Sequence, residues 1–132
     1  MTLSVGQIFP EKVFIVTREK LRAYAQASGD HNPIHLDEEF AKSVGLPNVI
    51  AHGMYTMALA GEAVRGWVGK NGEFVEFSTR FTKPVVVPAS TDVAISFTGV
   101  VSDIDAESIV IEVNAICDGV KVLGQTKARL KL

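Results

Sequence analysis

The chain has 132 residues, of which 47% are hydrophobic and 21% charged, with a net charge of −2. This is the make-up of an ordinary folded domain. The slight excess of acidic residues argues against a protein that binds duplex nucleic acid, because such proteins usually carry a basic face. No apolar run approaches the ~18 residues of a membrane span, and the N-terminus lacks the charged start and apolar block of a signal peptide. We therefore expect a cytoplasmic, single-domain protein over residues 1–132 that binds neither nucleic acid nor membrane.

The first half of the chain is predicted to be mainly helical. A short strand over 13–16 comes first, and Thr17 then suits the N-cap of a helix that ends at Gly29, a residue typical of helix C-termini. A second, short helix is expected over 37–43, where acidic residues stand in the first turn and favour the positive end of the helix dipole.

A longer third helix is expected from about 52 to 68, where apolar residues recur at helical spacing. Many of its side chains are small, and few are polar. We therefore expect this helix to be largely buried. Its larger side chains, Met54, Met57 and Trp67, are expected to belong to the core rather than to a ligand site.

After residue 72 the apolar pattern changes to a period of two, which is typical of strands. Strands are expected over 74–81, 91–101, 108–116 and 120–132. The Asp118-Gly119 pair is a strong hairpin signal, and a second turn is expected over 103–106. The lone Cys117 alternates with apolar residues and is expected to be a buried thiol. These elements indicate an α+β domain in which one helix packs on a curved antiparallel sheet.

The segment YAQASGDHNPIH, from Tyr24 to His35, carries the richest chemistry. It places the carboxylate of Asp30, the amide of Asn32 and the imidazole of His35 where the first helix gives way to a loop. Loops that hold ionisable side chains on a scaffold are typical of active sites, and a carboxylate with an imidazole can supply an acid and a base. The same residues are also good turn formers, so a purely structural role stays open.

Together with Ala41, this segment resembles the signature of the MaoC-like, (R)-specific enoyl-thioester hydratases. The sequence AHGM at 51–54 resembles the second motif of that family, at the start of its central helix, and FTKPVVVP at 81–88 resembles a strand end of bacterial members. The resemblance covers nearly the whole chain and implies the hot-dog fold, a long helix wrapped by an antiparallel sheet. It extends in particular to the catalytic subunit type of actinobacterial (3R)-hydroxyacyl-ACP dehydratases.

The resemblance implies a hydro-lyase that reversibly hydrates trans-2-enoyl thioesters to (3R)-3-hydroxyacyl thioesters, or dehydrates them, in fatty-acid metabolism. Asp30 and His35 would hold the catalytic water, with Asp30 favoured as the base and His35 relaying the proton at Cα; which residue handles which proton stays open. Gly53 is the candidate oxyanion donor, because the first amides of a helix lack partners within it. Asn32 would bind the reacting groups or fix the loop, and fixing the loop is favoured for a turn residue.

No metal and no redox cofactor are expected. The pantetheine thioester belongs to the substrate, whose carrier would be coenzyme A or acyl carrier protein (ACP). The resemblance also implies a dimer with an acyl tunnel near the subunit interface. That dimer would contain two identical chains or this chain and a second hot-dog subunit.

Three alternatives stay open from the sequence. The first is a hot-dog thioesterase, for which Glu62 is the candidate carboxylate on the central helix. The second is a non-catalytic partner subunit of a dehydratase heterodimer. The third, much less favoured, is a metal site built from the three histidines His31, His35 and His52, whose spacing matches no usual zinc pattern. His52 is otherwise expected to be a structural histidine, and His31 to be exposed.

Overall fold

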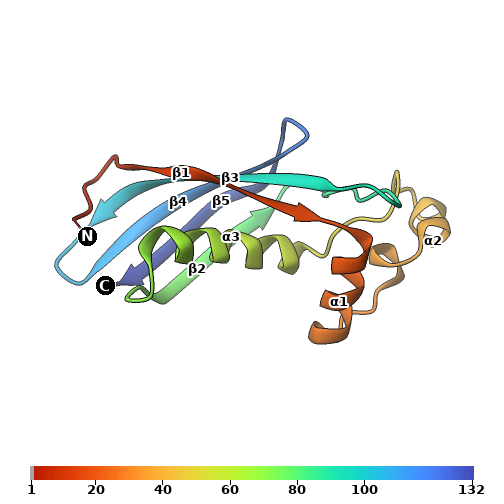
Figure 1. Ribbon diagram of the computed structural model, residues 1–132, viewed down its shortest axis with the longest axis horizontal. Coiled ribbons are helices and arrows are strands. Elements are labelled where there is room, and N and C mark those ends of the chain that lie inside the picture. The colour runs from red at the N-terminus through yellow and green to blue at the C-terminus, as the bar shows by residue number, and fades with distance from the viewer. Residues whose placement is uncertain (1) are drawn as a thin grey trace.

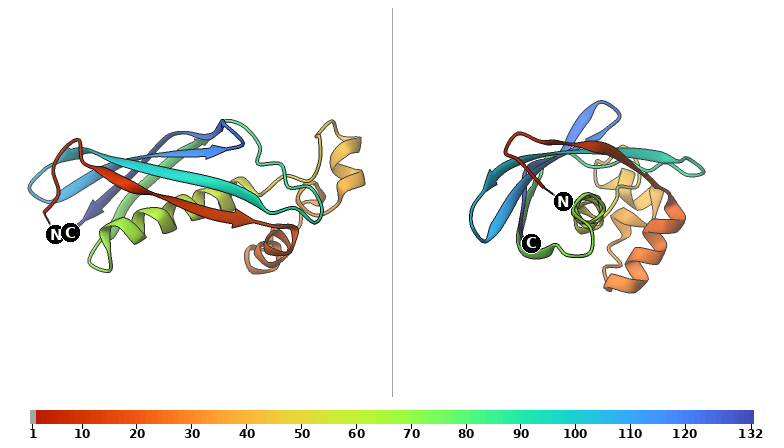
Figure 2. Two further views of the ribbon diagram at one scale, coloured as in Figure 1. Left: turned by 45° about the horizontal axis from the view of Figure 1, so that its top comes forward. Right: turned by 60° about the vertical axis from the view of Figure 1, so that its left-hand side comes forward.

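A computed structural model describes residues 2–132, so Met1 of the expected domain lies outside the described residues. Its strands form one antiparallel sheet in the order β1-β3-β4-β5-β2. The sheet curves over the longest helix, α3, while α1 and α2 lie beyond one end of α3 (Figures 1 and 2). The elements are β1 (Ile8–Val16), α1 (Arg18–Ser28), the 3-10 turn η1 (Pro33–His35), α2 (Glu38–Ser43), α3 (Gly53–Val68), β2 (Glu73–Phe81), β3 (Val93–Ile104), β4 (Ser108–Cys117) and β5 (Val120–Lys131). The predicted α+β class is confirmed.

The ends of helix α1 are as the sequence predicts. The Thr17 hydroxyl accepts a hydrogen bond from the Lys20 amide at 3.2 Å, and Gly29 closes the helix with a φ of 82°. Strand β1 is longer than predicted, because pairing with β3 begins at Ile8. A shift in register between Phe9 and Lys12 accommodates Pro10 there, as an edge strand allows. Pattern alone therefore missed the first half of this strand.

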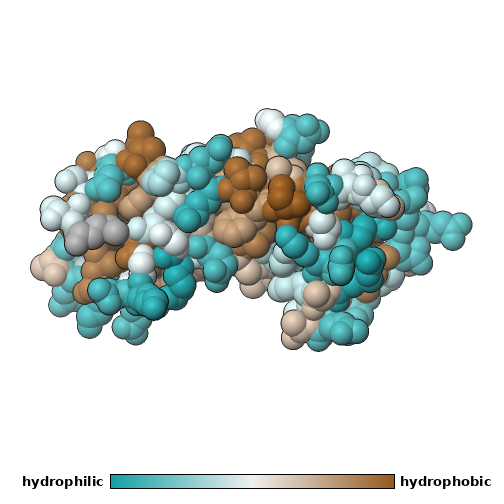
Figure 3. All heavy atoms as spheres, in the orientation of Figure 1, coloured by the Kyte–Doolittle hydropathy of each residue, from teal (hydrophilic) through white to brown (hydrophobic). Residues whose placement is uncertain are grey.

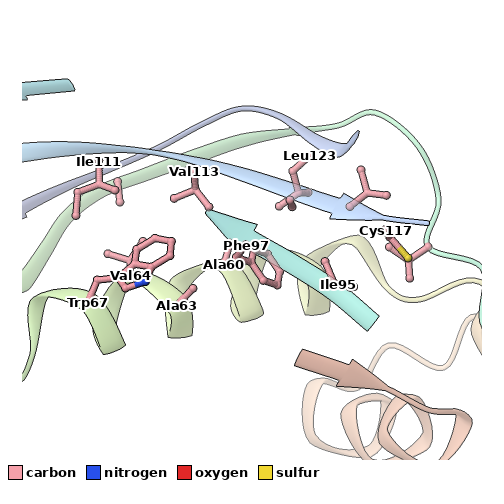
Figure 4. Close-up of a cluster of buried hydrophobic side chains, with 14 of the residues drawn as sticks. Ala60, Ala63, Val64, Trp67, Ile95, Phe97, Ile111, Val113, Cys117 and Leu123 are labelled. Atoms are coloured by element: carbon pink, nitrogen blue, oxygen red, sulfur yellow. The ribbon is translucent and has the colours of Figure 1, made fainter. Parts of the chain in front are cut away.

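The core lies between α3 and the concave face of the sheet. Side chains on one face of the helix point toward sheet residues such as Ile111 and Val113 (Figure 4). These helix residues are Ala60, Ala63, Val64 and Trp67. Small side chains at two of these positions let the helix approach the strands closely.

Trp67 is fixed in this core from two sides. Its Nε1–H donates to the Pro10 carbonyl at 2.8 Å, and its ring stacks on Phe9 with the centroids 5.2 Å apart. Gly99 on β3 faces the indole, since a methyl group added there would lie only 2.4 Å from a ring atom. The absence of a side chain at Gly99 therefore makes room for Trp67.

Only one face of α3 is buried, so the expectation of a largely buried helix was wrong. Trp67 is in the core as predicted, but Met54 is 57% exposed and Met57 is half-buried. The open face continues onto β2, every residue of which is at least partly exposed. Helical periodicity indicated the apolar character of α3 but not how far the sheet reaches around it.

The hairpin between β4 and β5 turns at Asp118 and Gly119, whose φ angles of 52° and 72° are both positive, as the Asp-Gly signal predicts. The neighbouring Cys117 is buried, as expected, and burial raises the pKa of its thiol. On the outer face of the sheet, apolar side chains gather over the middle of β1 (Figure 3), where Val13 and Ile15 are exposed.

A short bridge far from the main ladders holds the segment before α3. The Ala51 amide donates to the Val85 carbonyl at 2.9 Å, and the Val87 amide donates to the Val49 carbonyl at 2.8 Å. Arg18 secures the same bridge from α1, because its guanidinium donates to the Val87 carbonyl and, at 2.7 Å, to the side chain of Asn48. These contacts fix the start of α3 against the remainder of the fold.

Within residues 2–132, no helix has both the length and the apolar character to cross a membrane.

Candidate active site

The loop from Ser28 to Ile34 is folded by its own short polar side chains. The Ser28 hydroxyl accepts from the Asp30 amide, and an Asp30 carboxylate oxygen accepts from the Asn32 amide, both at 3.1 Å. The Asn32 side-chain oxygen in turn accepts from the Ile34 amide at 3.2 Å and caps η1. Such local bonds are why Ser, Asp and Asn favour turns. Asn32 thus holds the loop in shape, while the Asp30 side chain stays exposed.

His35 lies at the end of η1 and is only 8% exposed. Its Nδ1 is 2.8 Å from the Ile50 carbonyl oxygen. Since a carbonyl can only accept, Nδ1 carries the hydrogen, and Nε2 of the neutral ring is left with a free lone pair. Ile50 is itself held by its amide, which donates to Ile34, and by its pairing with Val86. The fold therefore fixes both the tautomer and the orientation of His35.

His52 lies against both predicted catalytic residues, although the sequence placed it outside the catalytic set. Its Nε2–H donates to the backbone carbonyl of Asp30 at 3.1 Å, and its ring stacks on His35 with the centroids 4.0 Å apart and the planes 26° apart. The side chain is 1% exposed, and this burial lowers the pKa of His52 below its usual value. The contact joins residues 22 positions apart in the chain, so local pattern gave no signal for it.

Asp30, His35 and His52 each bring one potential ligand atom to within 4.8 Å of the others. The metal alternative from the sequence used His31, His35 and His52. In the structure His31 is exposed and lies outside this cluster, which contains Asp30 instead. Stacked imidazoles direct their lone pairs along nearly parallel planes rather than toward one point. The arrangement therefore suits proton transfer by one ring and a carboxylate better than coordination of an ion.

A cavity of about 290 Å³ opens beside His35 and the start of α3. Asp30 is not one of its lining residues, although its carboxylate lies within 4.8 Å of a ring nitrogen of the lining residue His35. Most of the wall is apolar, and the buried Thr56 adds a hydroxyl. Thr56 was not singled out from the sequence. The lining residues are His35, Ile50, Ala51, Gly53, Thr56, Phe81, Thr82, Lys83, Pro84, Val85 and Val122.

Gly53 is the first residue of α3 and lines this cavity. The amides of Tyr55 and Thr56 both donate to the His52 carbonyl, at 3.0 and 3.2 Å, and are the first to bond within the helix. The Gly53 amide precedes them, at the end where the helix dipole is positive. The structure thus places His35 and Gly53 in the wall of one cavity, with Asp30 next to His35 but outside that wall.

Glu62, the carboxylate of the thioesterase alternative, lies elsewhere. It lines a separate cavity of about 310 Å³ between α3 and β2, together with Arg65 and Phe74. A reaction at the first cavity would therefore not use Glu62.

Comparison with known sequences places this chain in a family. Residues 6–120 match the model of the MaoC like domain. A relative, 3-hydroxyacyl-thioester dehydratase X of Mycobacterium tuberculosis, is 43% identical over 81 residues, which are 61% of this chain and 28% of that protein. The chain thus spans little more than a quarter of that relative's length.

Solved structures agree. A MaoC-like dehydratase superposes with a TM-score of 0.94 at 35% identity, over 98% of this chain and 41% of the other. R-hydratase PhaJ1 from Pseudomonas aeruginosa gives a TM-score of 0.85 at 26% identity, over 98% of this chain and 81% of the other. A ChsH1-ChsH2 complex from Mycobacterium tuberculosis, at 19% identity and a TM-score of 0.89, shares the fold over 100% of this chain and 99% of the other. The chain belongs to the MaoC-like dehydratase family and has its hot-dog fold.

Proposed function

We propose that this chain is a hydro-lyase that adds water reversibly to a trans-2-enoyl thioester and forms the (3R)-3-hydroxyacyl thioester. The placement of Asp30 next to His35, which lines a largely apolar cavity together with Gly53, carries this proposal. The similarity to a hydroxyacyl-thioester dehydratase and an R-hydratase supports the same reaction class.

The acid–base pair suits a single water molecule. The free lone pair of His35 Nε2 and the Asp30 carboxylate are both acceptors, so one water can donate a hydrogen to each and direct an oxygen lone pair at C3 of the substrate. As the O–C3 bond forms, Asp30 takes a proton from the water. The carboxyl of Asp30 passes this proton to the Nε2 lone pair of His35, and the Nε2–H so formed delivers it to C2, which leaves Asp30 ionised and His35 neutral as at the start. Dehydration runs the same steps in reverse.

The attack drives negative charge onto the thioester oxygen. The Gly53 amide, at the positive end of α3, would donate to that oxygen. A donor of this kind contributes about 3 kcal/mol in other enzymes, or roughly two orders of magnitude in rate. Because water and proton come from the same side of the substrate, the addition is syn.

We further propose that the working form is a dimer through β2. This strand is an edge of the sheet, and its apolar residues, Phe81 and Val75 among them, are exposed together with Met54 on α3. An exposed apolar edge strand favours pairing with another chain. A second copy here would cover the side of the cavity that Phe81 lines, whereas a different hot-dog chain would make a heterodimer.

Hydration of crotonyl-coenzyme A and of crotonyl-ACP, followed by the loss of enoyl absorbance, tests the reaction and identifies the carrier. The expected product does not reduce NAD with an (S)-specific 3-hydroxyacyl-CoA dehydrogenase. Rapid formation of NADH would overturn the stereochemistry. Release of free thiol without hydration would indicate a thioesterase, and activity only after a second hot-dog chain is added would indicate a heterodimer.

A further inference from the structure

His52 links the two halves of the site through one side chain. It is the N-cap residue of α3, yet its imidazole makes no hydrogen bond to the first turn of that helix. The ring instead donates from Nε2 to the Asp30 carbonyl. Since His52 is bonded covalently to Gly53, this contact ties the loop of Asp30 to the start of the helix. Asp30, which would act on the water, and the Gly53 amide, which would bind the thioester oxygen, are thus both held in place by His52.

The position of the His52 ring is fixed by aromatic neighbours from two elements. His35 from η1 stacks on one face, and Tyr24 from α1 meets the ring edge-on with the centroids 4.8 Å apart. Tyr55 of α3 packs in turn against Tyr24 at 5.1 Å. The titratable groups around His52 are therefore Asp30, His35 and Tyr24, with Tyr55 behind Tyr24. An enclosed ring of this kind can orient His35 without itself reaching the cavity.

The hydrogen bonds of His52 favour its neutral form. Nε2 must carry a hydrogen, because its partner is a carbonyl oxygen. A second proton would have to sit on Nδ1, which is buried and has no hydrogen-bond partner among residues 2–132. A buried donor without an acceptor is costly, and so is a buried charge. The lowered pKa of His52, caused chiefly by burial, agrees with this geometry.

A neutral His52 matters for its neighbour. The two ring centroids are 4.0 Å apart, so a positive charge on His52 would oppose protonation of His35. We propose that His52 is a positioning residue that stays uncharged, holds the Asp30 loop against the Gly53 helix start, and leaves His35 as the one imidazole of the stack that takes up a proton. The kinetic consequence rests on the proposed hydratase reaction, whereas the protonation state of His52 does not.

Paired substitutions separate the hydrogen bond of His52 from its bulk. His52→Phe keeps a stacked ring but removes the donor, while His52→Gln keeps an N–H donor at similar reach and cannot be charged. For crotonyl-coenzyme A, we expect His52→Phe to lower kcat at least about tenfold with KM changed less than about threefold, since misplaced groups slow the chemical step. We expect His52→Gln to recover part of that loss. His31→Gln, in the exposed part of the same loop, is the matched control.

Two kinetic outcomes would overturn the proposal. One is a wild-type kcat in folded His52→Phe. The other is an equal loss in both variants that follows their loss of thermal stability, as a merely structural histidine would give.

Long-range ¹H–¹⁵N spectra of the histidine rings test the protonation state without any substrate, in wild-type protein. Assignment uses the His31→Gln and His52→Gln variants. The expected spectrum shows His52 as a neutral Nε2–H tautomer with a titration midpoint below about 6.5. A charged ring or an Nδ1–H tautomer at pH 7 would refute the proposal. If wild-type protein hydrates no enoyl thioester, the proposed function fails, while these spectra still decide the state of His52.

Discussion

The ring of Phe81 lies across Gly53, so that a methyl group added to Gly53 would be 3.1 Å from three of the ring carbons. This distance is shorter than an ordinary van der Waals contact, and Phe81 would have to move by a few tenths of an ångström. Both residues line the cavity beside His35. The Phe81 ring in the cavity wall therefore packs closely against Gly53, the first residue of α3, and leaves little room for a side chain there.

We expect Gly53→Ala to lower kcat/KM for crotonyl-coenzyme A about tenfold or more, because the displaced ring alters access to the amide. Steady-state kinetics with purified protein measure the effect. Gly61→Ala is the matched control on the same helix, since its methyl group would meet Phe77 at 3.4 Å, an ordinary contact. Unchanged kinetics in Gly53→Ala would argue against an oxyanion role for this residue.

We expect Asp30→Asn and His35→Ala each to lower turnover at least about 100-fold, the usual size of an acid–base contribution. Both side chains lie beside the cavity rather than in the main core, so circular dichroism and thermal melts should show a retained fold. The control variant His31→Gln, changed at an exposed position, should keep the activity of the wild-type protein. Near-normal hydration by either folded site variant would remove that residue from the proposed acid–base pair.

We expect the purified protein to be a dimer joined through β2 at micromolar concentration. Light scattering measures the mass directly. Val75→Lys, on the exposed side of this edge strand, should shift the equilibrium toward monomer, because a charged side chain on an edge opposes pairing. Val13→Lys on the opposite edge strand β1 is the control and should not change the mass. A fully active monomer would contradict the dimer.

We expect the free energy of unfolding to fall as the pH drops below about 6.5. The pKa of His52 is lowered by burial in the folded chain, so between the folded and unfolded pKa values the unfolded chain binds more protons. Stability therefore rises with pH through this window. Urea titrations at several pH values from 5 to 7 give the free energy of unfolding at each pH. The slope of this free energy against pH should be shallower for His52→Gln than for wild type. Identical slopes would mean that His52 titrates alike in both states.

We expect Gly99→Ala to destabilise the fold by about 1–3 kcal/mol, the range seen when a close-packed core is overfilled. The added methyl group would lie 2.4 Å from the Trp67 ring, which is held by Phe9 and Pro10 and has little freedom to move. Chemical denaturation measures the loss. Gly99→Ala/Trp67→Phe should recover part of it, because the smaller ring leaves room. A Gly99→Ala protein as stable as wild type would show that the indole can yield.

The helix ends and the hairpin turn could be predicted from the sequence, because they depend on residues close together in the chain. Thr17, Gly29 and the Asp118-Gly119 turn act within a few residues, and each lies where expected. The class of fold and the grouping of Asp30 with His35 followed from pattern and motif. His52 was harder to interpret, because its role depends on a partner that only the tertiary fold brings near.

The exposure of Met54 and the length of β1 were missed for a similar reason. A helical period marks an apolar face without showing how far a sheet covers it. The pairing of residues around Pro10 with β3 depends on a strand more than 80 positions later, as the partnership of Ile8 with Val100 shows.

Arg18 and the bridge between 49–51 and 85–87 bear on the order of events in folding. The loop residues and the start of α3 all come early in the chain, yet their spacing is set by Val85 and Val87, and Arg18 reaches across 69 positions to bond the latter. Contacts of such sequence separation form slowly. A nascent chain that has not yet supplied this later segment would hold Asp30, His35 and Gly53 without the contacts that fix the start of α3, and we expect it to lack the proposed activity. During refolding, activity should return only with the last, long-range step.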